Sequence, residues 1–332
     1  MAESYIERFT HLRTDTSAAR WSAATNYRAP HKPFLLLAVL DLIGQGLIKT
    51  NFIEFNAQLI DTFDLYWTKV MAREKDGNPV LPFFHLRSEG FWALVPTPGM
   101  EHALAATRQV RSIGQLRQLV LGAQVDDALF EAMRDPKRCQ GLRSALIESY
   151  FAPEIRPLLA EVGKITAESL LYGREMLRRA RGHFTLKEAP ETESGYRAEA
   201  RSVAFRRIVV EAYDHTCAMC GIRLVTPEGR TAVAAAHIVP WTVSHNDDPR
   251  NGVALCGLHH WTFDQGMTGI TSDYQINVSP VVPSAEESAR PLLALMGRGL
   301  RRPANPTLHP AKTALRWHWE NIFRSVIPPR PP

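Results

Sequence analysis

Three short stretches indicate the fold of the C-terminal part of the chain. They are CAMC at residues 217–220, AHIVP at residues 236–240 and NGVALCGLHHWTFDQG at residues 251–266. Cys217 and Cys220 form a C-x-x-C pair, and Cys256 with His259 forms a C-x-x-H pair further along the chain. A tetrahedral zinc ion is bound by four such ligands in two close pairs. A small hairpin and helix bury little apolar surface, so a bound zinc would supply folding energy. The spacing therefore predicts a structural zinc site.

Two other interpretations of these cysteines stay open, a redox-active C-x-x-C pair and buried thiols without a metal. No thioredoxin-like pattern surrounds Cys217 and Cys220, which argues against the redox pair. The first residues, MAESYIERFTHLRTD, carry charges where a signal peptide needs an apolar stretch. We therefore expect a cytoplasmic protein in which thiols near histidines bind metal rather than form disulfides. No role is predicted for Cys139.

Local patterns around these residues predict an order of strand, strand and helix. Short strands are expected at 217–225 and 231–239, joined by a Thr-Pro-Glu-Gly turn, followed by a helix over 251–266 that ends in glycine. An amphipathic helix is expected over 201–213, because Phe205 and Val209 fall on one face. A last helix is expected over 311–323.

His237, Asn251 and His260 follow one another through the zinc-ligand frame, and in this order they resemble the HNH nucleases of the ββα-metal fold. The resemblance covers residues 213–270. It implies that His237 is the general base that takes a proton from water, a task for which histidine is suited near neutral pH. It also implies that Asn251 braces the loop and the base. His260 and Asp264, four residues apart on one helical face, would hold a catalytic Mg²⁺ or Mn²⁺.

This sequence departs from the family pattern at Ala236, where many members carry Asp or His as a further metal ligand. His245 or Asp247 in the following loop could replace that ligand. The departure also leaves a non-catalytic alternative open, in which the chain binds modified DNA through a site too poor in ligands to cut it.

The composition is that of a folded protein of two or three domains. The chain has 332 residues, 45% of them hydrophobic and 22% charged, with a net charge of +5. This excludes wholesale disorder, and the basic balance permits a polyanionic partner. The longest nearly unbroken apolar run, residues 34–43, is too short to span a bilayer.

A polar, charged segment at about 178–201 is the best candidate for a linker. It predicts a DNA-recognition domain at 1–175, a linker at 176–200 and an HNH domain with a C-terminal helix at 201–332. In the first domain, helices are expected at 34–46, 117–134 and 141–151, and a short hairpin at 79–96. The expected fold class is α+β, mainly helical with a small sheet in the first domain.

Two stretches of the first domain suggest contact with nucleic acid. In YRAPHKPFLLLAVLDLI, residues 27–43, basic side chains crowd the start of a buried helix, where backbone N–H groups favour anions. In LPFFHLRSEGFW, residues 81–92, aromatic and cationic residues are mixed. The plainer alternative is that the prolines begin a helix and that the aromatic residues are core.

In this order, ahead of an HNH unit, the two stretches resemble the sulfur-binding domain of phosphorothioate-dependent restriction endonucleases. The resemblance implies a sulfur pocket walled by Leu81, Pro82 and His85. It implies contacts to the phosphate backbone and neighbouring base edges from Tyr27, Arg28, His31 and Lys32. Arg28 would read a guanine through a bidentate contact.

The expected function is that of an endonuclease that recognises double-stranded phosphorothioate DNA and hydrolyses nearby phosphodiester bonds. Cutting both strands requires two active sites, so a homodimer or two molecules per site is expected. An HNH restriction enzyme that reads modified cytosine is the closest rival.

Overall fold

The computed structural model describes residues 2–71, 77–188, 195–226 and 229–325. Contacts within the chain divide it into two compact units, the first built from residues 1–167 and 227–229 and the second from residues 168–226 and 230–332. The boundary lies inside helix α9 (Arg156–Arg179), ahead of the linker expected at 176–200. Within that expected linker, residues 189–194 lie outside the described residues.

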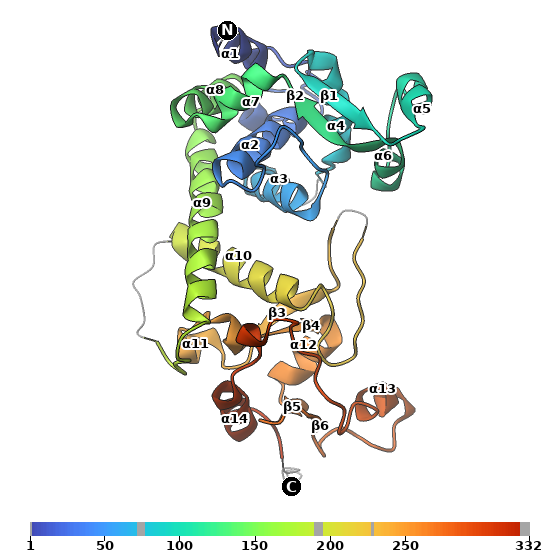
Figure 1. The fold of residues 1–332 in the computed structure, drawn as a ribbon, viewed down its shortest axis with the longest axis vertical. Helices are drawn as coiled ribbons and strands as arrows, with labels where there is room; N and C mark the ends of the chain where they lie inside the picture. Colours follow the sequence, from blue (N-terminus) through green and yellow to red (C-terminus); the bar gives the residue numbers. More distant parts are fainter. Residues whose placement is uncertain (1, 72–76, 189–194, 227–228, 326–332) are drawn as a thin grey trace. The chain divides into compact units, whose positions relative to one another are not determined.

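The first unit is mainly helical, and its central element is the apolar helix α2 (Figure 1). Every residue of α2 from Lys32 to Ile43 is buried, and the helix packs against α3, α4, α7 and α8. The unit contains α1 (Ala2–Thr10), α2 (His31–Gly44), α3 (Ala57–Val70), α4 (Val80–His85), β1 (Trp92–Pro96), α5 (Glu101–Ala106), α6 (Ile113–Leu119), β2 (Val120–Val125), α7 (Asp127–Arg134), α8 (Pro136–Tyr150) and the first half of α9. The helices expected from residues 34 and 141 are confirmed.

Two expectations for this unit are wrong. Residues 80–85 form a helix rather than a hairpin strand, because Pro79 and Pro82 suit a first turn and Phe83 and Phe84 bury completely in the core. The expected helix over 117–134 is interrupted by β2, which pairs antiparallel with β1. In β2 the valines at both ends are buried, as in a strand packed on a core.

The second unit contains the ββα arrangement. Antiparallel strands β3 (Val233–His237) and β4 (Gly252–Cys256) pair so that His237 lies opposite Gly252, and α12 (Gly257–Asp264) follows β4 directly. Helix α10 (Gly195–Ala212) packs on both strands. The other described elements are α11 (Trp241–Ser244), β5 (Thr268–Ile270), β6 (Ile276–Val278), α13 (Arg290–Leu293), α14 (Lys312–Asn321) and 3₁₀ turns at Pro249–Asn251, Glu287–Ala289 and Pro306–Leu308. The expected α+β class is confirmed as a mixture of helices and small sheets.

The order strand, strand, helix is present, but with a different pair of strands from the one expected. The segment 217–225 does not form a strand. It forms the turn that carries Cys217 and Cys220, and an isolated β-bridge joins Val225 to Thr231. Residues 252–256 form the second strand instead of the start of a helix, because Val253, Ala254 and Leu255 are all buried. The helices expected over 201–213 and 311–323 correspond to α10 and α14.

Gly252 lets α10 lie close to the strands. A Cβ atom at this position would come within 2.5 Å of Val209 Cγ2 and 2.9 Å of Phe205 Cζ. Both contacts are shorter than real Cβ contacts, so a side chain here would push α10 away from His237. In the described part of the chain, no helix is both long enough and apolar enough to cross a membrane.

Candidate active site and metal centre

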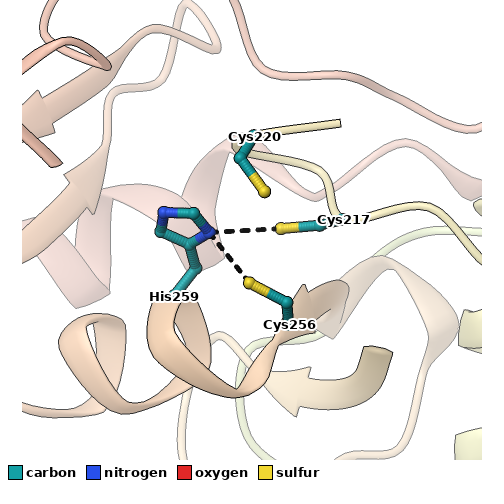
Figure 2. A group of neighbouring side chains, drawn as sticks. All are labelled: Cys217, Cys220, Cys256 and His259. Carbon is teal, nitrogen blue, oxygen red and sulfur yellow. Dashed lines mark hydrogen bonds between the residues drawn. The ribbon is translucent and has the colours of Figure 1, made fainter. Parts of the chain in front are cut away.

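The four predicted zinc ligands lie together in the second unit (Figure 2). The ligand atoms of Cys217, Cys220, Cys256 and His259 lie within 4.8 Å of one another. His259 Nδ1 is 3.5 Å from Cys217 Sγ and 3.1 Å from Cys256 Sγ. Tetrahedral zinc with ordinary bond lengths would separate sulfur and nitrogen by about 3.6 Å. The cluster is therefore close to the geometry of a tetrahedral metal site.

The protonation of the thiols also fits a cation. Burial alone would raise the pKa of the Cys217 thiol, but its hydrogen bond with His259 and nearby backbone N–H groups outweigh burial and lower the pKa to about 6. Burial and the charge of Cys217 raise the pKa of Cys220 to about 12. A cation among the sulfurs would offset this repulsion and favour three thiolates, which are the form that binds metal.

Two of the three predicted catalytic residues, His237 and His260, line one pocket of about 400 Å³ together with the predicted metal ligand Asp264. His237 reaches it from the end of β3, and His260 and Asp264 reach it from α12. His260 Nε2 lies 3.4 Å from Asp264 Oδ2. Burial raises the pKa of the Asp264 carboxyl, opposed by the charges of His260 and His237. A cation held between these two side chains would stabilise the ionised carboxylate, as expected of a metal-binding pair.

Asn251 braces the loop between the two strands. It is fully buried, and its Oδ1 accepts a hydrogen bond from Val239 N at 2.9 Å. Its Nδ2 donates to the carbonyls of Val239 and Asn246, at 3.1 and 3.0 Å. These contacts hold the two ends of the loop together directly after His237. The geometry fits the bracing role that the HNH resemblance implies.

The loop itself is tied to the segment that precedes α10. Arg250 Nη1 donates to the Gly182 carbonyl at 2.9 Å, and Glu188 N donates to Ser244 O at 2.8 Å. Arg250 also pairs with Asp248 at 2.7 Å. Described residues at the start of the expected linker therefore support the active-site loop.

His245 and Asp247, the two candidates for replacing the ligand missing at Ala236, lie in the loop between β3 and β4. Ala236 is buried and pairs across the sheet with Val253. Neither His245 nor Asp247 is among the described residues that line the pocket. Asp247 Oδ1 instead lies 2.7 Å from His237 Nε2. This contact depends on how the loop folds back on β3, which no local pattern in the sequence indicates.

The first unit contains a separate pocket of about 350 Å³ that brings the two singled-out stretches together. Its lining includes five of the predicted DNA-binding residues: His31, Lys32, Leu81, Pro82 and His85. Trp21 and Ala29 add apolar surface, and Arg13 and Asp15 lie at the same pocket. The residues near α2 and those of α4 are far apart in the sequence, and the packing of α4 against α2 brings them together.

Both pocket histidines are disposed to be neutral. Burial lowers the pKa of His31 to about 4, and its ring lies between Trp21 and Trp67. Burial lowers the pKa of His85 as well, helped by the charges of Lys32 and Arg87. Near neutral pH the pocket therefore presents uncharged imidazoles beside proline and leucine.

The other predicted DNA contacts have different surroundings. The Lys32 ammonium forms a buried ion pair with Glu89 and donates to the Arg13 carbonyl at 2.9 Å. This pairing reduces the charge that Lys32 can offer to a phosphate. Tyr27 is exposed, and the Arg28 guanidinium lies over the Tyr150 ring. Neither is among the pocket-lining residues. Phe83, Phe84 and Trp92 are core residues, as the plainer alternative predicted.

Comparison with known proteins identifies the class of the second unit. Residues 217–271 match the family described as HNH endonuclease. The chain therefore carries an HNH endonuclease domain, and HNH nucleases depend on a metal ion.

Among solved structures, the chain is similar to a protein titled "Modification dependent TagI restriction endonuclease". The two are 22% identical with a TM-score of 0.29, and the match covers 39% of this chain and 41% of that one. The chain thus spans about two fifths of the length of that protein. No curated protein matches the chain.

Proposed function

We propose that this nuclease is a modification-dependent restriction endonuclease that recognises phosphorothioate-modified double-stranded DNA. The observation that carries the proposal is the pocket of the first unit, which gathers Leu81, Pro82 and His85 from one stretch and His31 and Lys32 from the other. These are the residues that the sulfur-binding resemblance implies. The HNH unit would then cut phosphodiester bonds near the modification.

The chemistry of the pocket suits sulfur. In a phosphorothioate, sulfur replaces one non-bridging oxygen, and it is larger, more polarisable and a poorer hydrogen-bond acceptor. A wall of leucine and proline beside neutral imidazoles accepts that atom, whereas a phosphate oxygen placed there would lose hydration without recovering it. One unsatisfied polar atom costs about 1–3 kcal/mol, which corresponds to a preference of roughly 10- to 100-fold.

Affinity for the rest of the DNA would come from side chains around the pocket. Tyr27 and Arg28, which lie outside its lining, would meet the phosphate backbone and base edges. Arg28 is the candidate for a bidentate contact to guanine. Lys32, paired with Glu89, would act through the shape and charge of the pocket wall more than as an isolated cation.

In the HNH unit, His237 would take a proton from a water molecule whose oxygen bonds to phosphorus. The bond from phosphorus to the leaving oxygen then breaks, and that oxygen takes a proton from solvent. His260 and Asp264 would hold a Mg²⁺ or Mn²⁺ ion, which when bound neutralises charge that develops on the phosphate oxygens. Asn251 keeps the loop after the base in one conformation. The cluster of Cys217, Cys220, Cys256 and His259 would hold a structural zinc ion, and two copies of the chain would cut the two strands.

A binding competition tests the recognition step. Two duplexes identical except for one phosphorothioate are compared by gel shift at one fixed salt concentration, because phosphate contacts make affinity salt-dependent. We expect the wild type to prefer the sulfur duplex by roughly 10- to 100-fold. In the variants Pro82→Ser and His85→Ala, the affinities for the sulfur duplex and the unmodified duplex should differ by no more than about threefold. The affinity for the unmodified duplex should stay unchanged.

The control variant is His102→Ala, an exposed position of α5 in the same unit. It should keep the wild-type preference. Equal binding of both duplexes by the wild type would refute phosphorothioate recognition, and a preference for a methylcytosine duplex would support the rival function.

A further inference from the structure

Asp247 is a buried carboxylate that joins the candidate base to two helices of the second unit. Only 2% of the residue is exposed. Its Oδ1 lies 2.7 Å from His237 Nε2. Its Oδ2 accepts from Arg201 Nη1 of α10 at 2.5 Å and from the Tyr172 hydroxyl of α9 at 3.2 Å. Each oxygen of this carboxylate therefore has its own set of partners.

These contacts determine which imidazole nitrogen carries the proton. Arg201 forms an ion pair with Asp247, and an ionised carboxylate can only accept hydrogen bonds. His237 Nε2 must therefore be the nitrogen that donates. In the neutral imidazole the other nitrogen, Nδ1, then keeps its lone pair, which a general base requires.

The ring is also fixed in orientation. The Phe205 ring of α10 stacks on the His237 ring with centroids 3.9 Å apart and planes 6° from parallel. Stacking restricts tilt of the imidazole, and the hydrogen bond to Asp247 restricts its rotation about the Cβ–Cγ bond. Arg201, in turn, lies over the Trp241 ring, 4.0 Å from its centroid. Trp241 lines the active-site pocket, so the supporting residues are part of its surroundings.

We propose that Asp247 is a positioning residue that holds His237 as the Nε2–H tautomer, with Arg201 and Tyr172 fixing the orientation of its carboxylate. This role differs from that of a metal ligand. The inference rests on the proposed role of His237 as the base. When His237 takes a proton from water, Asp247 would also stabilise the resulting imidazolium.

The variant Asp247→Asn gives a specific test because the two oxygens of the carboxylate have different partners. Arg201 and Tyr172 are both donors, so the amide oxygen of asparagine would face them. The amide NH₂ group would then face His237 Nε2, which would have to accept. The proton would move to Nδ1, and the base would lose its lone pair.

We expect ¹⁵N spectra of the full-length protein to show His237 protonated on Nε2 in the wild type and on Nδ1 in Asp247→Asn. On the sulfur duplex, kcat should fall by about 10²- to 10⁴-fold, the range typical of acid–base catalysis, with KM unchanged. Combining Asp247→Asn with His237→Ala should add no further loss to that of His237→Ala alone, since the two residues act as a unit.

The matched control is Asp273→Asn. Asp273 is an exposed carboxylate of the same unit that pairs with a cation, Lys312, at 3.7 Å, and it is not among the residues that line the pocket. Its variant should keep the Nε2–H tautomer of His237 and a kcat within about threefold of the wild type.

Unchanged protonation of His237 in Asp247→Asn would overturn the proposal, as would equal losses of kcat in the Asp247 and Asp273 variants. The spectra separate this proposal from the proposed function. A tautomer change in a protein that cuts neither duplex would contradict the proposed function and leave the positioning role of Asp247 supported.

Discussion

Replacing His237 with alanine should lower the single-turnover rate of DNA cleavage by about 10²- to 10⁴-fold, the usual contribution of a general base. His237 lines the pocket that also contains His260 and Asp264, and alanine cannot accept a proton from water. DNA affinity should stay within about threefold, because the proposed recognition pocket belongs to the first unit. The measurement is cleavage at saturating enzyme with Mg²⁺ and, separately, with Mn²⁺.

His183→Ala is the control for this experiment, since His183 is exposed and belongs to the same unit. It should cut at the wild-type rate. If the wild type and His237→Ala were equally inactive with both cations at equal DNA binding, the enzymatic role of this site would be refuted in favour of the non-catalytic alternative.

Replacing Cys217 with serine should abolish binding of one zinc ion and unfold the second unit. Structural zinc binding is worth about 10–16 kcal/mol in small metal-dependent domains, which is comparable to the whole free energy of unfolding of a typical domain. The Cys217 and Cys256 side chains come from segments on either side of β3, so losing the metal frees the turn around Cys217 from the strand pair. Metal content and calorimetric unfolding of the full chain measure the effect.

The control is Cys139→Ser, because Cys139 is a partly buried thiol of the first unit. It should keep its zinc and the unfolding transition of the second unit. In Cys217→Ser the first unit should still unfold cooperatively and still bind the sulfur duplex. Full zinc content and an unchanged transition in Cys217→Ser would exclude the structural metal site.

The site residues that could be grouped correctly from the sequence are those that lie close together along the chain. The spacing of Cys256 and His259 within one turn, and of His260 and Asp264 four apart, is set by the geometry of one helix. The pair of Cys217 and Cys220 could be assigned to the same site because tetrahedral zinc needs four donors, of which Cys256 and His259 supply two. The strand expected over the first pair is absent because the turns around Cys217 and Cys220 bring both sulfurs towards His259.

Contacts between distant segments could not be predicted in this way. Asp247 and Asp248 have the same charge and adjacent positions, yet one pairs with His237 and the other with Arg250. The choice depends on how the loop closes around Asn251 and on where α10 places Arg201. Lys32 likewise pairs with Glu89, which no local pattern connects to it.

The most direct test of the account is cleavage by the wild-type chain of two duplexes that differ only in one phosphorothioate, with Mg²⁺ or Mn²⁺ and with His237→Ala as the blank. The protein concentration is set between the dissociation constants for the two duplexes. We predict that the sulfur duplex is then cleaved at least about 10-fold faster than the unmodified duplex. Equal rates on the two duplexes would contradict recognition of the sulfur.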